Sequence, residues 1–228
     1  MADLQTILSS NDLNHQRSVY PSTSGYGLKV DHSSPVWGWK DLTGQIIPRS
    51  GGAAAPAFTP FHGSNVKVYS GNAGDKIDNI TFHIPHDYVP NTDMYIHIHW
   101  GHNGTAISGT FSGNYHAIYS KGYTQAGEIF ESELTIPWTT GAIADVIEVP
   151  RWSHNITELA ITNAGGDTTH FDRADIETDG LMMISWTIGT TPTISGSDES
   201  NLPYIFMIDL HYQSNQLATK GRNTPFYD

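Results

Sequence analysis

The sequence predicts an all-β protein, an antiparallel β-sandwich of the jelly-roll type with extended N- and C-terminal arms. Three observations lead to this class: short runs in which apolar and polar residues alternate, clusters of turn residues between them, and no stretch of ten residues with a convincing 3.6-residue apolar period. The 228 residues include 22 Gly and 12 Pro, and only 15% are charged. This composition is typical of a chain with many turns and few surface helices. Strands of unequal spacing favour a jelly roll over an immunoglobulin-type sandwich.

Ten runs are expected to form strands, and the clearest alternate with a period of two. In residues 93–100, two isoleucines and Trp100 fall on one face, while His97 and His99 fall on the other with Tyr95. Such alternation indicates strands with one buried face. The expected strands are residues 36–40, 65–70, 80–85, 93–100, 114–123, 128–138, 145–149, 157–162, 181–188 and 204–212.

The length fits one domain, which we place at residues 35–213 between an N-terminal arm (1–34) and a C-terminal tail (214–228). The arm has little apolar surface, so burial alone cannot offset the entropy lost when it orders. The residues leave open whether this arm is mobile or docked on a partner. The tail ends in a Pro-Phe-Tyr sequence, which suits insertion into a groove of a neighbouring molecule.

Charge and composition argue against several classes of protein. The chain has 11 Lys+Arg and 23 Asp+Glu, a formal net charge of −12, so no nucleic-acid partner is expected. No run of 18 apolar residues is present, and no membrane-spanning segment or secretory signal is expected. The absence of cysteine excludes disulfides, zinc–cysteine sites and cysteine nucleophiles.

The histidines are the main candidates for a chemical site. The chain has 12 of them, and His97 and His99 lie on one strand face, with His211 and Asp209 sharing a face of the last strand. Cupin-type jelly rolls begin a metal site with such a pair, but no carboxylate follows at the cupin position. We expect no cofactor and no metal, and interpret these rings first as polar side chains on a solvated or subunit-facing surface. A metal site and a pH-sensing cluster stay open as alternatives.

No enzymatic activity is expected, because the chain lacks a nucleophile elbow, a phosphate-binding loop and a dinucleotide fingerprint. A cupin-like metalloenzyme on His97, His99 and His211 is the alternative. The aromatic residues also allow a glycan-binding module, in which exposed rings stack on sugars. We favour contacts with other proteins, and the interface candidates are Trp37, Trp39, Lys220, Arg222, Phe226 and Tyr227.

Four segments resemble virion structural proteins of tailed bacteriophages: Phe82–Tyr88 (FHIPHDY), Asp93–Trp100 (DMYIHIHW), Ile208–Gln213 (IDLHYQ) and Lys220–Tyr227 (KGRNTPFY). The resemblance covers about residues 36–228 and brings no catalytic residues. It implies a capsid decoration or cement protein that binds the major capsid protein on the outside of the head. A homotrimer in the virion, assembled in the bacterial cytoplasm, is the expected form. A tail, neck or fibre-attachment protein of the virion is the alternative.

Overall fold

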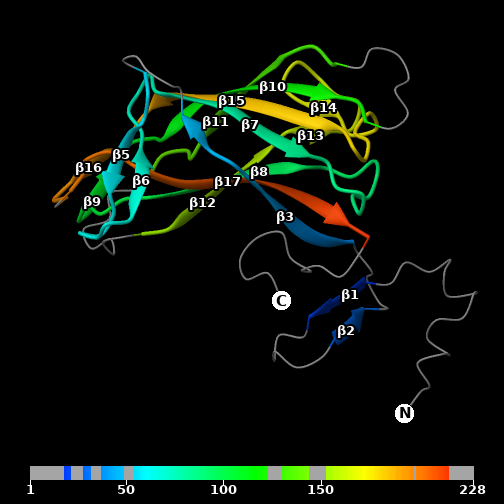
Figure 1. Cartoon of the computed structure of the whole chain (residues 1–228), viewed down its shortest axis with the longest axis horizontal. Coiled ribbons are helices and arrows are strands. Elements are labelled where there is room, and N and C mark those ends of the chain that lie inside the picture. Colours follow the sequence, from blue (N-terminus) through cyan, green and yellow to red (C-terminus); the bar gives the residue numbers. More distant parts are fainter. Residues whose placement is uncertain are drawn as a thin grey trace, which may run out of the picture.

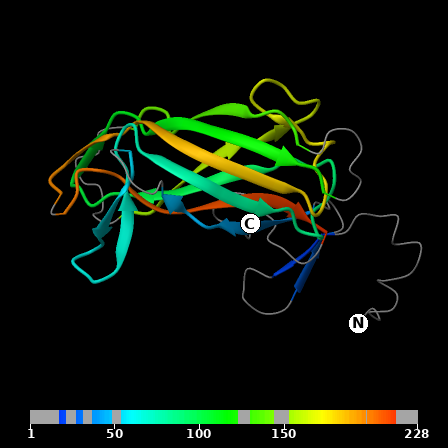
Figure 2. The same ribbon diagram turned by 45° about the horizontal axis from the view of Figure 1, so that its top comes forward.

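The prediction of an all-β antiparallel sandwich is confirmed. The computed structural model describes residues 18–21, 28–31, 37–48, 54–122, 130–143, 153–197 and 199–215, and within them it contains strands and no helix. Two large sheets pack face to face (Figure 1), and the turned view in Figure 2 shows the two layers. No helix in the described part of the chain is long and apolar enough to cross a membrane.

The first sheet carries the candidate site. Its strands follow the order β12-β8-β17-β6-β5, and β3 pairs with the second half of β17. The bounds are β3 (Gly38–Gly44), β5 (Ala57–Pro60), β6 (Lys67–Ser70), β8 (Tyr95–Gly101), β12 (Asn155–Ala160) and β17 (Tyr204–Ser214). Strand β17 therefore lies inside the sheet and pairs on both edges.

The second sheet has the order β11-β10-β15-β7-β4 and covers the other side of the core. Its strands are β4 (Ile47–Pro48), β7 (Lys76–His83), β10 (Ser112–Ser120), β11 (Leu134–Thr139) and β15 (Leu181–Thr190). Three short pairs complete the structure: β1 (Ser18–Pro21) with β2 (Leu28–Asp31), β9 (Ala106–Ser108) with β16 (Thr193–Ser195), and β13 (Thr162–Asn163) with β14 (Phe171–Asp172). The last of these pairs is parallel and the others are antiparallel.

The core is built from the inward residues of both sheets, as the period-two pattern predicts. Its centre is Trp186, which is fully buried. Its ring lies 5.5 Å from Phe111, 5.7 Å from Tyr115 and 5.4 Å from Trp138, measured between centroids. These edge-on and stacked pairs add to the free energy gained by burying the rings.

Nine of the ten expected runs contain a strand in the structure, and the tenth, 145–149, lies outside the described residues. Several short strands were missed, among them β5, β9 and β16. Within the expected arm, Val19 pairs with Val30 in the β1–β2 hairpin, which the sequence analysis did not predict. Each of these missed strands has only three or four residues, too few for alternation to stand out.

Replacing Trp186 by alanine should lower the free energy of unfolding by about 3–5 kcal/mol, because it leaves a large cavity among three aromatic rings. Urea denaturation followed by circular dichroism measures this change. Phe58→Ala is the control, since Phe58 is 55% exposed and its removal should cost less than about 1 kcal/mol. Equal losses for the two variants would contradict the assignment of Trp186 to the centre of the core.

Candidate functional site

The outer face of the first sheet holds a cluster of histidines and carboxylates. Strand register brings them together: Asp209 on β17 is paired with His97 on β8, and His97 is paired with Glu158 on β12. On the other edge of β17, His211 is paired with Asp41 on β3. We call this group the histidine cluster; it comprises His97, His99, Asp209 and His211, with Asp41, Glu158 and His154 around them.

Most of the cluster is buried although it lies on the face turned away from the core. His97 is 4% exposed, Asp209 1% and His211 1%. The ring of Trp39 packs edge-on against His211 at 5.2 Å and against Tyr95 at 5.7 Å between centroids. His97 and His211 are therefore not on a solvated surface, and a subunit-facing surface stays a prediction.

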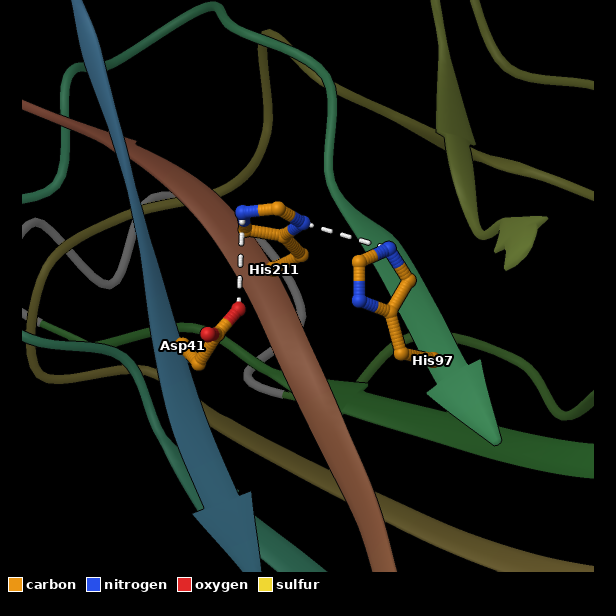
Figure 3. Close-up of side chains that lie close together, drawn as sticks. All are labelled: Asp41, His97 and His211. Carbon is orange, nitrogen blue, oxygen red and sulfur yellow. Dashed lines mark hydrogen bonds and ion pairs between the residues drawn. The ribbon is translucent and has the colours of Figure 1, made fainter. Parts of the chain in front are cut away.

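The rings are joined by a continuous set of short contacts. His211 Nδ1 lies 3.1 Å from His97 Nε2, which also lies 3.2 Å from Glu158 Oε2. His211 Nε2 faces Asp41 Oδ1 at 3.4 Å. Figure 3 shows the two histidine rings and Asp41 approaching one another from β8, β17 and β3.

A second branch of contacts passes through Asp209. His99 Nε2 donates to Asp209 Oδ2 at 2.8 Å, and His99 Nδ1 lies 2.9 Å from His154 Nε2. Asp209 Oδ1 lies 3.5 Å from His97 Nδ1 but has no hydrogen-bond partner. The donor atoms of His97, His99 and Asp209 all lie within 4.8 Å of one another, as do those of Asp41, His97 and His211.

Two members of the cluster have pKa values displaced by their surroundings. Burial, together with the nearby Asp209 carboxylate, raises the pKa of Asp41, against the opposing effect of His97 and His99. Burial and the neighbouring His99 lower the pKa of His154, which favours its neutral form. Both shifts combine partial burial with the effect of neighbouring ionisable groups of the cluster.

Sequence reasoning found part of this cluster. The structure brings together His97, His99, His211 and Asp209, as strand faces predict, but Asp41, Glu158 and His154 were missed. The alternation in residues 36–40 continues to Asp41. Extending the expected strand by one residue would have placed Asp41 on the same face as Trp39. Nothing in the sequence indicates which strands are neighbours. The pairing of β12 with β8 is what brings Glu158 to His97.

The interface candidates have different outcomes. Trp39 is half-buried against the histidine cluster, and Trp37 lies one residue before β3 and is also half-buried. The remaining four candidates, Lys220, Arg222, Phe226 and Tyr227, lie outside the described residues. The packing of Trp39 ties it to His211 and makes it a poor platform for sugar stacking.

A second feature lies where the first and last strands of the sandwich meet. Gly38, at the start of β3, is paired with Ser214, at the end of β17. Asp87 links β3 and β17 here. Its carboxylate accepts hydrogen bonds from Lys40 Nζ at 2.6 Å, Ser214 Oγ at 2.6 Å and Tyr212 OH at 3.1 Å. We call this region the terminal corner, because the described sandwich begins and ends here.

The Asp87 side chain is 11% exposed. Burial alone would raise its pKa, but the hydrogen bonds from Lys40, Ser214 and Tyr212 outweigh burial and lower the pKa below its ordinary value. The terminal corner therefore holds an ionised, fully paired carboxylate.

Comparisons with known proteins identified no relative: no family model, no curated protein and no solved structure matches the chain.

Asp87→Asn should lower the free energy of unfolding at neutral pH by about 2–3 kcal/mol, because it removes a poorly exposed charge that accepts hydrogen bonds from three donors. The folded pKa of Asp87 lies below the unfolded value of about 3.9, so its contribution is present above that value and is lost as pH falls through the folded pKa. The difference between variant and wild type should therefore shrink at acid pH. Urea unfolding at pH 7 and pH 3 measures it. Glu133→Gln is the control, since Glu133 is 56% exposed, and a difference independent of pH would contradict the assignment.

Proposed function

We propose that this chain is a structural protein of a tailed-bacteriophage virion, a decoration protein that binds the outside of the major capsid protein lattice and stabilises the head. The observation that carries the proposal is the terminal corner, where Gly38 is paired with Ser214. Residues 1–36 and 216–228 are joined to the sandwich at this one place. A partner that binds both segments gains two linked contacts, and the second contact forms at high effective concentration.

The strand order supports a jelly roll, the form of sandwich implied by the resemblance to virion proteins. Eight strands give the sheet orders β12-β8-β17-β6 and β11-β10-β15-β7, in which strands far apart in the sequence are neighbours. The last strand, β17, lies beside β6. Two Greek keys produce such an arrangement, since a Greek key returns its fourth strand to the side of its first.

Charge and edge chemistry support the proposed location and assembly. The net charge of −12 opposes contact with packaged DNA and suits the outer surface of a head. The hairpin of β5 and β6 ends the first sheet and exposes Phe58 by 55% and Val66 by 62%. Exposed apolar side chains on an edge hairpin favour association, and a homotrimer is the proposed assembly.

Removing residues 1–34, or residues 216–228, should weaken binding to capsids at least about tenfold, because each truncation removes one of two linked contacts. The melting temperature should change by less than about 3 °C, since neither truncation removes a sandwich strand. Co-sedimentation with undecorated capsids and thermal unfolding measure the two quantities, with Glu133→Gln as a folded control. Truncations that bind as well as the full chain would overturn the role assigned to the terminal corner.

Cryo-electron microscopy of virions from the phage that encodes the chain should show hundreds of copies on the icosahedral shell. The number follows from the proposed lattice binding, since every capsomer offers an equivalent site. Quantitative mass spectrometry against the major capsid protein provides an independent count. A few copies at one vertex would instead assign the chain to the neck, tail or fibre attachment, and no copies would exclude a virion protein.

A further inference from the structure

The negative charge of Asp209 is not balanced by a lysine or an arginine within the described part of the chain. Its side chain is almost fully buried in the middle of a sheet, and residue exposure is 1%. Within the described part of the chain its ion-pair partners are His97 and His99, and no lysine or arginine reaches it. Its Oδ1 atom is buried without a hydrogen-bond donor. A buried carboxylate with an unsatisfied oxygen is costly unless a cation or proton compensates it.

The surrounding contacts indicate which nitrogen of His97 carries the proton. His97 Nε2 lies 3.2 Å from Glu158 Oε2, a carboxylate oxygen that accepts hydrogen bonds. On its other side, His211 Nε2 faces the Asp41 carboxylate, so His211 Nδ1 is left as the acceptor toward His97 Nε2. Glu158 Oε2 and His211 Nδ1 are therefore both acceptors, which places the N–H of His97 on Nε2. A neutral His97 then turns the lone pair of Nδ1 toward Asp209 Oδ1, 3.5 Å away.

Two acceptors that face each other at this distance require a positive group between them. We propose that His97 Nδ1, His99 Nε2 and Asp209 bind one divalent transition-metal ion, of which zinc is the reference, between β8 and β17. Two imidazoles and one carboxylate form a common donor set for such ions, with a further position for water. The ion would take the place of the proton that lies between His99 Nε2 and Asp209 Oδ2. A neutral His99 that binds the ion through Nε2 carries its proton on Nδ1 instead, where it is donated to His154 Nε2.

The geometry of the donors fits this assignment. Zinc bonds of about 2.0–2.1 Å in a tetrahedral site place neighbouring donors about 3.3 Å apart. Here His99 Nε2 lies 2.8 Å from Asp209 Oδ2 and His97 Nδ1 lies 3.5 Å from Asp209 Oδ1, so the two histidines face different oxygens of the carboxylate. Each ligand histidine is also oriented through its other nitrogen, His97 by Glu158 and His99 by His154. Such outer partners fix the ring and raise the basicity of the ligand nitrogen.

A neighbouring group, Asp41, His97 and His211, is the competing location, but its chemistry is less suitable. The nitrogens through which His97 and His211 approach each other are 3.1 Å apart and are joined by a hydrogen bond. The Asp41 side chain is 51% exposed, so water satisfies it without an ion. The unsatisfied oxygen belongs to Asp209, and the ion is assigned beside it.

Zinc binding is measured on the full untagged chain after treatment with EDTA and removal of the chelator. Isothermal titration with zinc chloride should show one tight site per chain, and elemental analysis after dialysis should find one zinc. The melting temperature should rise by roughly 5–10 °C when free zinc reaches about 100 times the Kd, because the ion binds the folded chain.

Substitutions distinguish the proposed site from its neighbours. His99→Asn should weaken zinc binding more than about 100-fold, since it removes a ligand, and its side chain, 12% exposed, lies at the more open side of the cluster. Asp209→Asn should have the same effect with nearly the same shape.

Asp179→Asn is the matched control, because Asp179 also lies between two histidines, with Nε2 of His83 at 3.2 Å and Nε2 of His86 at 2.9 Å, but on the surface. Its positive φ of 63° is tolerated by asparagine, so the variant should fold and bind zinc as the wild type does. The proposal is overturned if the wild-type chain binds no stoichiometric zinc. It is also overturned if His99→Asn retains the zinc, or if Asp179→Asn loses it. Folding of each variant is checked by circular dichroism, and His99→Asn keeps the test decisive if Asp209→Asn fails to fold.

Discussion

The pairing of β17 on both edges is the constraint on which the rest of the structure depends. One edge pairs with β8 and the other with β6 and then β3, and β17 contributes residues both to the core and to the histidine cluster. The register shifts between Ile205 and Met207, where one extra residue is inserted. Because a one-residue slip reverses the faces of a strand, this bulge lets Ile205 and Ile208 both be buried while Asp209 points outward. Core and cluster are thus fixed by the same strand register.

Two poorly exposed carboxylates at this end of the sandwich are compensated in different ways. Asp87 has a lysine, a tyrosine and a serine, so both of its oxygens are satisfied by donors. Asp209 is more deeply buried, and its described partners are imidazoles. Imidazole is positive only when it takes a second proton, and neutral imidazole is a ligand for metal ions. The different partners explain why Asp87 has a structural role and Asp209 indicates a binding site.

The sequence predicted the sheet faces better than the sheet neighbours. Alternation within residues 93–100 correctly separated the isoleucines from His97 and His99, because side-chain direction depends on local geometry. In 204–212 it correctly placed Asp209 and His211 on one face, but the bulge near Ile205 interrupts the pattern. Which strands lie side by side depends on long-range pairing. The contact of Glu158 with His97 could not be predicted for this reason, nor could the packing of Trp39 against His211. The short strands were missed because few residues give no clear period.

The proposed attachment site and the proposed metal site are physically connected. Along the β3–β17 ladder, Asp41 is paired with His211, Lys40 with Tyr212, and Gly38 with Ser214. The histidine cluster and the terminal corner therefore occupy successive positions of one hydrogen-bonded pair. An ion between His97, His99 and Asp209 would cross-link β17 to β8 and oppose their separation. Force applied to a bound C-terminal segment would reach the sandwich through β17. The ion would therefore strengthen the attachment of β17 to β8, on which this force acts.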